Sequence, residues 1–451
     1  SRAYGPGSYH RAYEKGRVDY PFGYVRWTEK RNLAELVRLL ASGALEVETL
    51  IAGSFPVASV QDAFTAIADG TLPGIAALID YRAGDLAPDR RRTLAMRSGR
   101  VRAKREGELG VSVIGVGNHV LGVHLPNLKA SPGVVVRALV SATGKNAAMV
   151  AGGLGAAMVS TDVRVATGDP ETDAILVCSS HGEHFEQICR GLEGGKALLV
   201  EKPLVTRVEH LRELIARVAE STGALITLGL NRRYAPLVKT LRRSLPGPVD
   251  CVTYLVTPPK IPADHWTLDP VDGGGRLVAE AEHFVDLCHL LIDREPRAVT
   301  ARPLGQAPDD LRQLCNFSLT IYYDGAVAHV VFDESGGSFH PREQITVLSK
   351  GQVAVLEDFK KLTLCGPKKR LSQGGLKQDM GHGEQLRQFL RAVRGEENEL
   401  LEWRGVVGAS ACVFAAEQSL RRGGAVIDLA DFLTGDPGGA EGAEPAEDAA
   451  P

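Results

Sequence analysis

Val111-Ser112-Val113-Ile114-Gly115-Val116-Gly117-Asn118-His119 is the stretch that decides the fold. A run rich in β-branched residues ends in Gly-x-Gly, and residues spaced as on a helix follow at once. The pattern is typical of a buried strand that turns tightly into a helix, where the first glycine permits the turn and the second lets a pyrophosphate approach the backbone. The third fingerprint position holds Val120 instead of glycine or alanine, so the motif alone leaves dinucleotide binding and a structural turn equally open.

The composition is that of a globular protein. The chain has 451 residues, 44% hydrophobic and 24% charged, with a formal net charge of −3, which suits two or three domains. This charge gives no reason to expect nucleic acid as a partner, and no apolar run reaches the roughly 20 residues that span a membrane. The seven cysteines form no Cys-x-x-Cys pair, which favours reduced thiols in a cytoplasmic protein and no metal site.

Strands and helices alternate after Val111. Apolar strands are expected at 111–114, 134–140, 173–178, 197–200 and 224–228, with helical patterns between them. This spacing predicts an α/β domain over residues 109–230 with a doubly wound parallel sheet of the Rossmann type, which binds ligands at the carboxyl ends of its strands. Four residues fall at such ends and are expected to share one cleft: Gly115, Ser141, Ser179 and Glu201.

The pattern of expected strands and helices changes over residues 231–434. Period-two strands are expected at 249–256, 313–323, 326–332, 343–348 and 351–356, and helices at 284–291, 383–393 and 407–420. Asp324-Gly325 between two runs is a strong hairpin signal. The pattern predicts an α+β domain with a mostly antiparallel sheet. Residues 435–451, rich in Gly, Ala, Glu and Pro, are expected to be a disordered tail.

Residues 1–84 predict a small α/β piece with two amphipathic helices and a strand at 74–81. It has little core of its own, so it should dock on something or be marginally stable. Residues 85–108 predict a basic linker.

This N-terminal piece resembles the C-terminal end of zinc-type medium-chain alcohol dehydrogenases. The residues that carry the resemblance are 23–32, Phe55-Pro56 and Asp80-Tyr81. It implies that the zinc-bearing half and the cofactor domain of that family are missing here, so no zinc-dependent alcohol chemistry is expected. The chain then looks like the latter part of a two-enzyme fusion, cut or eroded at its N-terminus.

Several short motifs lie in a fixed order further along the chain. They are Gly117-Asn118, Ser141-Ala142-Thr143-Gly144, Glu201-Lys202-Pro203, Asn231-Arg232-Arg233-Tyr234, His265-Trp266, Gly273-Gly274-Gly275-Arg276 and Gln378-Asp379. In this order the sequence resembles the glucose–fructose oxidoreductase / inositol dehydrogenase (Gfo/Idh/MocA) family over about residues 110–430, and more narrowly its bi-domain members. The resemblance implies a Rossmann domain that holds NAD(P) and a C-terminal sheet that also supports homo-oligomers.

Oxidation of a sugar hydroxyl requires a hydride acceptor, a base and a cation that favours the forming alkoxide. The family's catalytic lysine falls on Lys202 and its catalytic histidine on His283, which is expected to begin a helix after the glycine-rich turn. The position of the family's aspartate holds Ala279. Three alternatives stay open: the adjacent Glu280 substitutes as a catalytic group, the chemistry differs, or the activity is low.

The expected cofactor contacts are Gly115, Gly117, Asn118, His119, Ser141, Thr143, Lys145, Ser179, His184, Glu201 and Lys202. No acid follows the second strand to grip the ribose hydroxyls, and small hydroxyls with a lysine tolerate a 2′-phosphate, so NADP is weakly preferred over NAD. The expected substrate contacts are Arg232, Tyr234, His265, Trp266, Arg276 and Asp286. Structural roles stay open for His184, in the lining of the cofactor cleft, and for Arg232, Tyr234 and Trp266, in packing.

The leading hypothesis is an NAD(P)-dependent oxidoreductase that acts on the CH–OH group of a sugar, sugar nucleotide or cyclitol. Two alternatives stay open. One is an NAD-using glycosidase of the same family, and the other is a non-catalytic binding or assembly protein, which Ala279 and the N-terminal remnant motivate.

Overall fold

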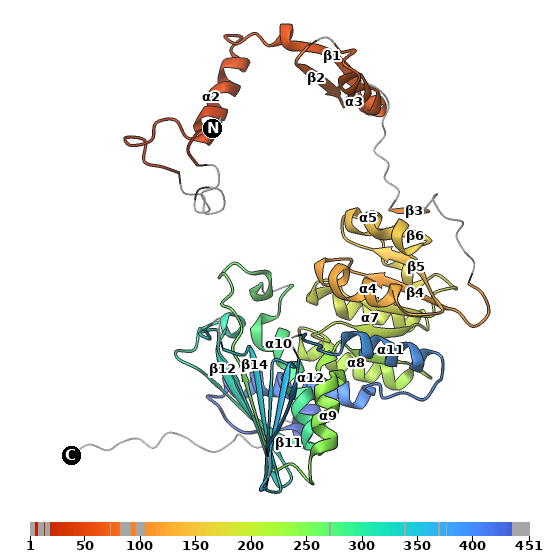
Figure 1. Cartoon of the computed structure of the whole chain (residues 1–451), viewed down its shortest axis with the longest axis vertical. Coiled ribbons are helices and arrows are strands. Elements are labelled where there is room, and N and C mark those ends of the chain that lie inside the picture. The colour runs from red at the N-terminus through yellow and green to blue at the C-terminus, as the bar shows by residue number, and fades with distance from the viewer. Residues whose placement is uncertain are drawn as a thin grey trace. The chain divides into compact units, whose positions relative to one another are not determined.

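The computed structural model describes residues 5–7, 13, 19–72, 74–81, 92–95, 104–269, 272–337, 340–368, 370–375 and 377–434. The chain divides into two compact units, Ser1–Arg91 and Arg92–Pro451 (Figure 1). Most of the expected linker and the whole expected tail at 435–451 lie outside the described residues.

The first unit is a small α/β piece, as expected. Its strands β1 (Ile51–Pro56) and β2 (Ala76–Asp80) pair in parallel, and it contains the helices α2 (Glu29–Ala41) and α3 (Val60–Ala68), with 3₁₀ turns η1 (Glu48–Leu50) and η2 (Val57–Ser59). No strand was expected at β1. Among the described residues of this unit, Ala63 is the one apolar side chain that is fully buried, so its helices present much apolar surface.

The second unit begins with a seven-stranded sheet in the order β3-β6-β5-β4-β7-β8-β9. Its strands are β3 (Thr93–Ala95), β4 (Leu109–Ile114), β5 (Val134–Val140), β6 (Met158–Ser160), β7 (Ala174–Val177), β8 (Ala197–Val200) and β9 (Ile226–Leu228). All neighbours are parallel except the edge pair β3–β6, and β3 lies inside the expected linker. The six residues of β4 are all buried because helices cover both faces of the sheet.

The helical segments of this half follow the strands at the expected places except α6, which follows β6, and neither of these two was expected. They are η3 (Val120–His124), α4 (Leu125–Lys129), α5 (Lys145–Leu154), α6 (Arg164–Thr167), η4 (His181–Glu183), α7 (His184–Glu193) and α8 (Val208–Glu220). The segment after the glycine turn is unusual, because η3 is a π-helical turn that passes into α4.

The second sheet of this unit has nine strands in the order β17-β16-β15-β14-β10-β13-β12-β11-β18. They are β10 (Cys251–Val256), β11 (Pro296–Pro303), β12 (Phe317–Tyr323), β13 (Ala326–Phe332), β14 (Glu343–Ser349), β15 (Gln352–Glu357), β16 (Lys361–Cys365), β17 (Arg370–Gly374) and β18 (Ile427–Asp428). All neighbours are antiparallel except β10–β13, and Asp324-Gly325 turns the hairpin between β12 and β13 as expected.

The helical segments of this half are η5 (Asn231–Tyr234), α9 (Pro236–Ser244), η6 (Trp266–Leu268), α10 (Gly275–Ile292), η7 (Leu311–Gln313), α11 (His382–Val393), α12 (Trp403–Arg421) and α13 (Leu429–Thr434). The prediction that His283 begins a helix is wrong, because α10 begins at Gly275 and His283 lies in its third turn. Gly274 precedes the helix with a φ of 80°, which only glycine adopts readily, so the glycine-rich turn ends there.

Helices α10 and α12 join the two sheets of the second unit. α12 contacts α8 and β9 of the first half and β11 of the second, while α10 packs on α12, β10 and β13. Both helices lie near the middle of this unit in Figure 1. One apolar core therefore runs from Ile114 in β4 to Phe332 in β13. The expected fold class, a Rossmann sheet followed by a mostly antiparallel α+β domain, is confirmed. Within the described residues, no helix combines the length and apolarity that crossing a membrane requires.

Glu282 on α10 is a buried carboxyl that ties this junction together. It accepts a hydrogen bond of 2.6 Å from Ser410 Oγ on α12 and one of 3.3 Å from the Leu204 N–H. Burial raises the pKa of Glu282 from 4.5 to about 7. Because the folded pKa lies above the unfolded value, the stabilisation that the protonated carboxyl provides is complete below about pH 4.5 and is lost as the pH rises to about 7.

We therefore expect wild-type protein to lose on the order of 3 kcal/mol of unfolding free energy across this window, and Glu282→Gln to lose much less because an amide stays neutral. Urea denaturation at pH 5 and pH 8 measures the difference. The exposed Glu397→Gln is the control and should follow the wild type. Equal pH dependence in wild type and Glu282→Gln would contradict the assignment.

Candidate functional site

The turn after β4 contains two glycines, of which the fold requires Gly115 but not Gly117. Gly115 has a φ of 88°, and a Cβ there would lie 2.3 Å from the backbone of Cys178 and Ser179. At Gly117 a Cβ would meet only Gly115 O, at 3.9 Å. The fold therefore explains the first glycine, and the space beside the second is available to a ligand.

A cavity of about 400 Å³ opens beside this turn. Its walls contain five of the expected cofactor residues, Gly115, Gly117, Ser141, Thr143 and Ser179, together with Asn146, Thr161, Glu183 and Gln187, which were not expected. The hydroxyl of Ser141 is buried and has no hydrogen-bond partner among the described residues, so it is free to bind a ligand. The size, the open glycine and this hydroxyl fit a dinucleotide.

The other expected cofactor residues do not line this cavity. Asn118, His119 and Lys145 are exposed nearby on the chain. His184 is buried, with Nδ1 2.7 Å from the carbonyl oxygen of Pro203 and Nε2 3.3 Å from that of Ser179, and burial lowers its pKa. Its ring therefore holds the Lys202-Pro203 segment against the end of β7.

Lys202 lies at the end of β8 and reaches helix α10. Its Nζ donates a 2.8 Å hydrogen bond to the carbonyl oxygen of Ala279 and forms a 3.4 Å ion pair with Glu280 Oε2. Burial alone would raise the pKa of Glu280, but the charges of Lys202 and Arg276 outweigh it and the pKa is lowered. The Lys202 ammonium thus contacts the backbone carbonyl of Ala279 and the carboxylate of Glu280.

His283 lies four residues after Ala279, on the same side of α10. It is buried, and its Nδ1 has no hydrogen-bond partner among the described residues. Burial holds the pKa of His283 well below its usual value, and the positive charges of Arg232 and Lys202 add to this effect. The imidazole is therefore neutral near pH 7, so one of its ring nitrogens is unprotonated.

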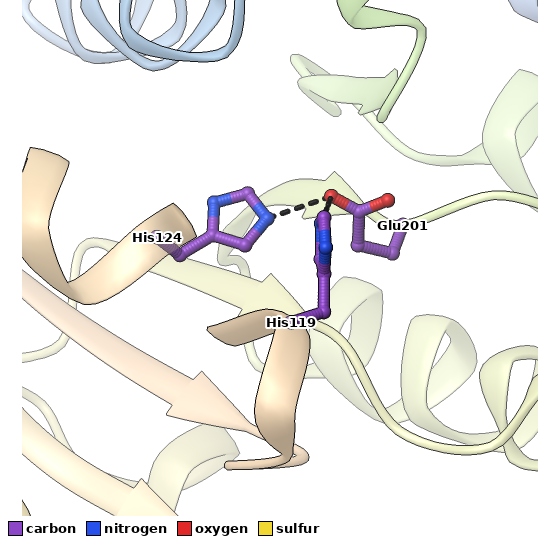
Figure 2. A group of neighbouring side chains, drawn as sticks. All are labelled: His119, His124 and Glu201. Atoms are coloured by element: carbon purple, nitrogen blue, oxygen red, sulfur yellow. Dashed lines mark hydrogen bonds and ion pairs between the residues drawn. The ribbon is translucent and has the colours of Figure 1, made fainter. Parts of the chain in front are cut away.

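Two histidine side chains contact the carboxylate of Glu201 (Figure 2). His124 Nε2 lies 2.6 Å and His119 Nε2 3.3 Å from the same oxygen, Glu201 Oε1. Burial works to raise the pKa of Glu201, but these hydrogen bonds outweigh it and the pKa lies well below its usual value. His124 was not expected from the sequence, because its contact is with a carboxylate 77 positions away.

Most of the expected substrate residues bind other parts of the protein. The Arg232 guanidinium forms two hydrogen bonds with Glu343, and the Tyr234 hydroxyl accepts the Leu401 N–H at 2.9 Å. Asp286 pairs with Arg233 at 3.1 Å, and Arg276 pairs with Glu334 at 3.0 Å.

His265 and Trp266 lie at the start of η6, where the His265 ring accepts the Thr267 N–H. The Trp266 side chain is about half exposed, and its ring meets the edge of His181 at 4.6 Å. Of the expected substrate residues, Trp266 thus retains a free apolar face.

Comparisons with known proteins show what this chain is similar to. Residues 109–229 match the family model GFO_IDH_MocA, described as an oxidoreductase family with an NAD-binding Rossmann fold. The inositol 2-dehydrogenase of Rhizobium meliloti is 29% identical over 205 residues, 44% of this chain and 57% of that protein. The match thus spans little more than half the length of this relative.

Two further relatives extend the comparison. The scyllo-inositol 2-dehydrogenase (NADP(+)) IolW of Bacillus subtilis is 25% identical over 270 residues, 58% of this chain and 72% of that protein. An oxidoreductase structure from Thermotoga maritima superposes with a TM-score of 0.60 at 18% identity, covering 72% of this chain and 99% of that chain. The structural likeness shows the two-domain fold.

The two glycines of the turn give a matched pair of variants. Gly115→Ala should lower the unfolding free energy by more than about 2 kcal/mol, because Cβ meets backbone atoms and φ is positive. Gly117→Ala should change it by less than about 1 kcal/mol but weaken NAD(P)H binding about tenfold or more, because its methyl group enters the space for the pyrophosphate. Urea denaturation and nicotinamide fluorescence measure the two effects. Unchanged nucleotide affinity in Gly117→Ala would contradict the placement.

Proposed function

We propose that this chain is an NAD(P)-dependent dehydrogenase acting on a sugar or cyclitol CH–OH group, because residues 109–229 match the model of an oxidoreductase family with an NAD-binding Rossmann fold. The observation that carries the proposal is that Lys202 bonds to the Ala279 carbonyl and pairs with Glu280 on α10, one helical turn before His283. The names of the inositol dehydrogenase relatives support the substrate class.

When bound, the nicotinamide ring supplies the hydride acceptor. The protein's part is to manage the proton and the charge on the substrate oxygen. The Lys202 ammonium, held by the Ala279 carbonyl, orients the hydroxyl and favours the forming alkoxide. His283 is neutral and takes the hydroxyl proton. Glu280 balances the charge of Lys202 in place of the family's aspartate, which is absent at position 279.

Substitution at these two positions separates catalysis from nucleotide binding. Lys202→Met and His283→Asn should each lower kcat by about 10²–10⁴-fold, because each removes a charge or a proton acceptor at the reacting oxygen. His283→Asn should keep its affinity for NAD(P)H. Turnover is followed by NAD(P)H absorbance with myo-inositol, scyllo-inositol and glucose as probes.

Lys129→Met, at an exposed position at the end of α4, is the control and should turn over as the wild type does. Full turnover in both Lys202→Met and His283→Asn would exclude the assigned roles. Absence of NADH and NADPH binding at millimolar concentration would exclude the enzyme itself.

For the cofactor, we propose a preference for NADP. The cavity residues that follow β5 are Ser141, Ala142, Thr143 and Asn146, with no carboxylate among them, and the exposed Lys145 starts α5 beside them. A carboxylate there would repel a 2′-phosphate, whereas a lysine attracts it. The Bacillus subtilis relative named above as an NADP(+) enzyme supports this choice.

Lys145→Ala should raise the Kd for NADPH by roughly 5–20-fold and leave the Kd for NADH within about twofold, because only NADPH carries the phosphate. Fluorescence titration with both nucleotides measures this ratio. A wild type that binds NADH more tightly, or a variant that loses both nucleotides equally, would contradict the preference.

We propose that the outer face of the nine-stranded sheet binds a second copy of the chain, since Tyr322, Leu348 and Val353 expose large apolar side chains there.

We propose that residues 1–84 are a remnant of an alcohol-dehydrogenase-like half, which is supported by the parallel pair β1–β2 and the poorly buried apolar residues beside it.

A further inference from the structure

Three side chains, one after the end of β8 and two at the opposite ends of η3, point their ligand atoms at one place (Figure 2). These atoms are His119 Nε2, His124 Nε2 and Glu201 Oε1, and all lie within 4.8 Å of one another. Two ligands of a tetrahedral Zn²⁺ at about 2.1 Å are roughly 3.4 Å apart. The His119–Glu201 separation of 3.3 Å already matches this value, and the 2.6 Å His124–Glu201 hydrogen bond would lengthen.

The backbone between the two histidines is built to bring them together. Residues five apart on an α-helix point about 140° away from each other, because each residue advances about 100°. Here Val120–His124 is a π-helical turn, in which the Leu125 N–H bonds to the Val120 carbonyl, five residues back. A π-turn advances less per residue than an α-helix because its hydrogen bonds span five residues, so it reduces this angle; such turns are rare and frequent at functional sites. His119 and His124 therefore face Glu201 from the same side, with their rings 5.3 Å apart.

The charges also suit a cation. The Glu201 side chain is only 15% exposed, and that of His124 only 3%. The adjacent Lys202 ammonium does not bond to Glu201 but to the Ala279 carbonyl and Glu280. With neutral imidazoles the set carries one buried negative charge, and a buried carboxylate is best stabilised by pairing with a cation. Two imidazoles and one carboxylate form a ligand set that zinc uses in catalytic sites, with a fourth position left open.

We propose that His119, His124 and Glu201 form a binding site for one divalent transition-metal ion, best suited to Zn²⁺, with a water molecule as the fourth ligand. This site was not expected from the sequence, which gave no metal ligands. The ion connects the nucleotide-binding turn to the residue before Lys202. Its binding does not depend on the proposed dehydrogenase activity, so each can fail without the other.

The test is metal binding to the full chain, stripped of metal with a chelator. Competition with a chromophoric zinc chelator should give one tight Zn²⁺ site per chain in the wild type, and Zn²⁺ should raise the melting temperature. Co²⁺ in its place should show the intense visible absorption of a four-coordinate ion. Glu201→Gln and His119→Ala should each weaken Zn²⁺ binding by at least 100-fold and abolish both the Co²⁺ spectrum and the thermal shift.

His119 is the safer position for the variant because its side chain is half exposed, so its replacement leaves the core intact. The exposed His329→Ala on β13 is the matched control and should bind Zn²⁺ as the wild type does. The proposal is overturned if the wild type binds no Zn²⁺ above micromolar affinity, or if His119→Ala and Glu201→Gln retain the same stoichiometry and affinity.

Discussion

The hydrogen bond from Lys202 Nζ to the Ala279 carbonyl is the contact on which the functional site depends. It joins the carboxyl end of β8 in the Rossmann sheet to the second turn of α10, which belongs to the other half of the unit. A partly buried ammonium is costly unless it is paired and hydrogen-bonded, and here Glu280 and the Ala279 carbonyl provide both. The two halves are thus held together at the place where, in the proposed function, a hydroxyl substrate meets the cofactor.

Helix α10 makes that contact possible because it is packed on every side. Glu282 links it to Ser410 on α12 and to Leu204 after Lys202, while Phe284 packs against Tyr254 of β10 at 5.1 Å. A helix held this firmly keeps the neutral imidazole of His283 on the same face as the carbonyl that receives Lys202. Ala279 stands where the family resemblance implies an aspartate, yet its backbone carbonyl still accepts the Lys202 hydrogen bond, which a residue of any type could do.

The sequence predicted the fold well where local pattern decides it. The turn at Gly115, the alternating strands and helices, and the hairpin at Asp324-Gly325 were all predicted from spacing and residue type. The start of α10 was not predicted. Its first residues, Gly275 and Arg276, continue a glycine-rich stretch that is typical of a loop, and only the structure shows that the turn ends at Gly274. β3 was missed because an edge strand depends on its partner more than on its own residues, and the inner strand β11 was missed because Pro, Arg and Thr interrupt its apolar residues.

Individual residues of the site could be predicted from the sequence. The contacts between them could not, because contacts between distant positions leave no local signal in the sequence. The Lys202–Glu280 ion pair and the His119–His124–Glu201 cluster each depend on such contacts. The most direct test of the central claim is a crystal structure of the full chain with NADP⁺ bound. We predict the pyrophosphate at Gly117, with the nicotinamide ring facing Lys202 Nζ and the His283 imidazole. A nicotinamide ring that points away from both side chains would contradict the account.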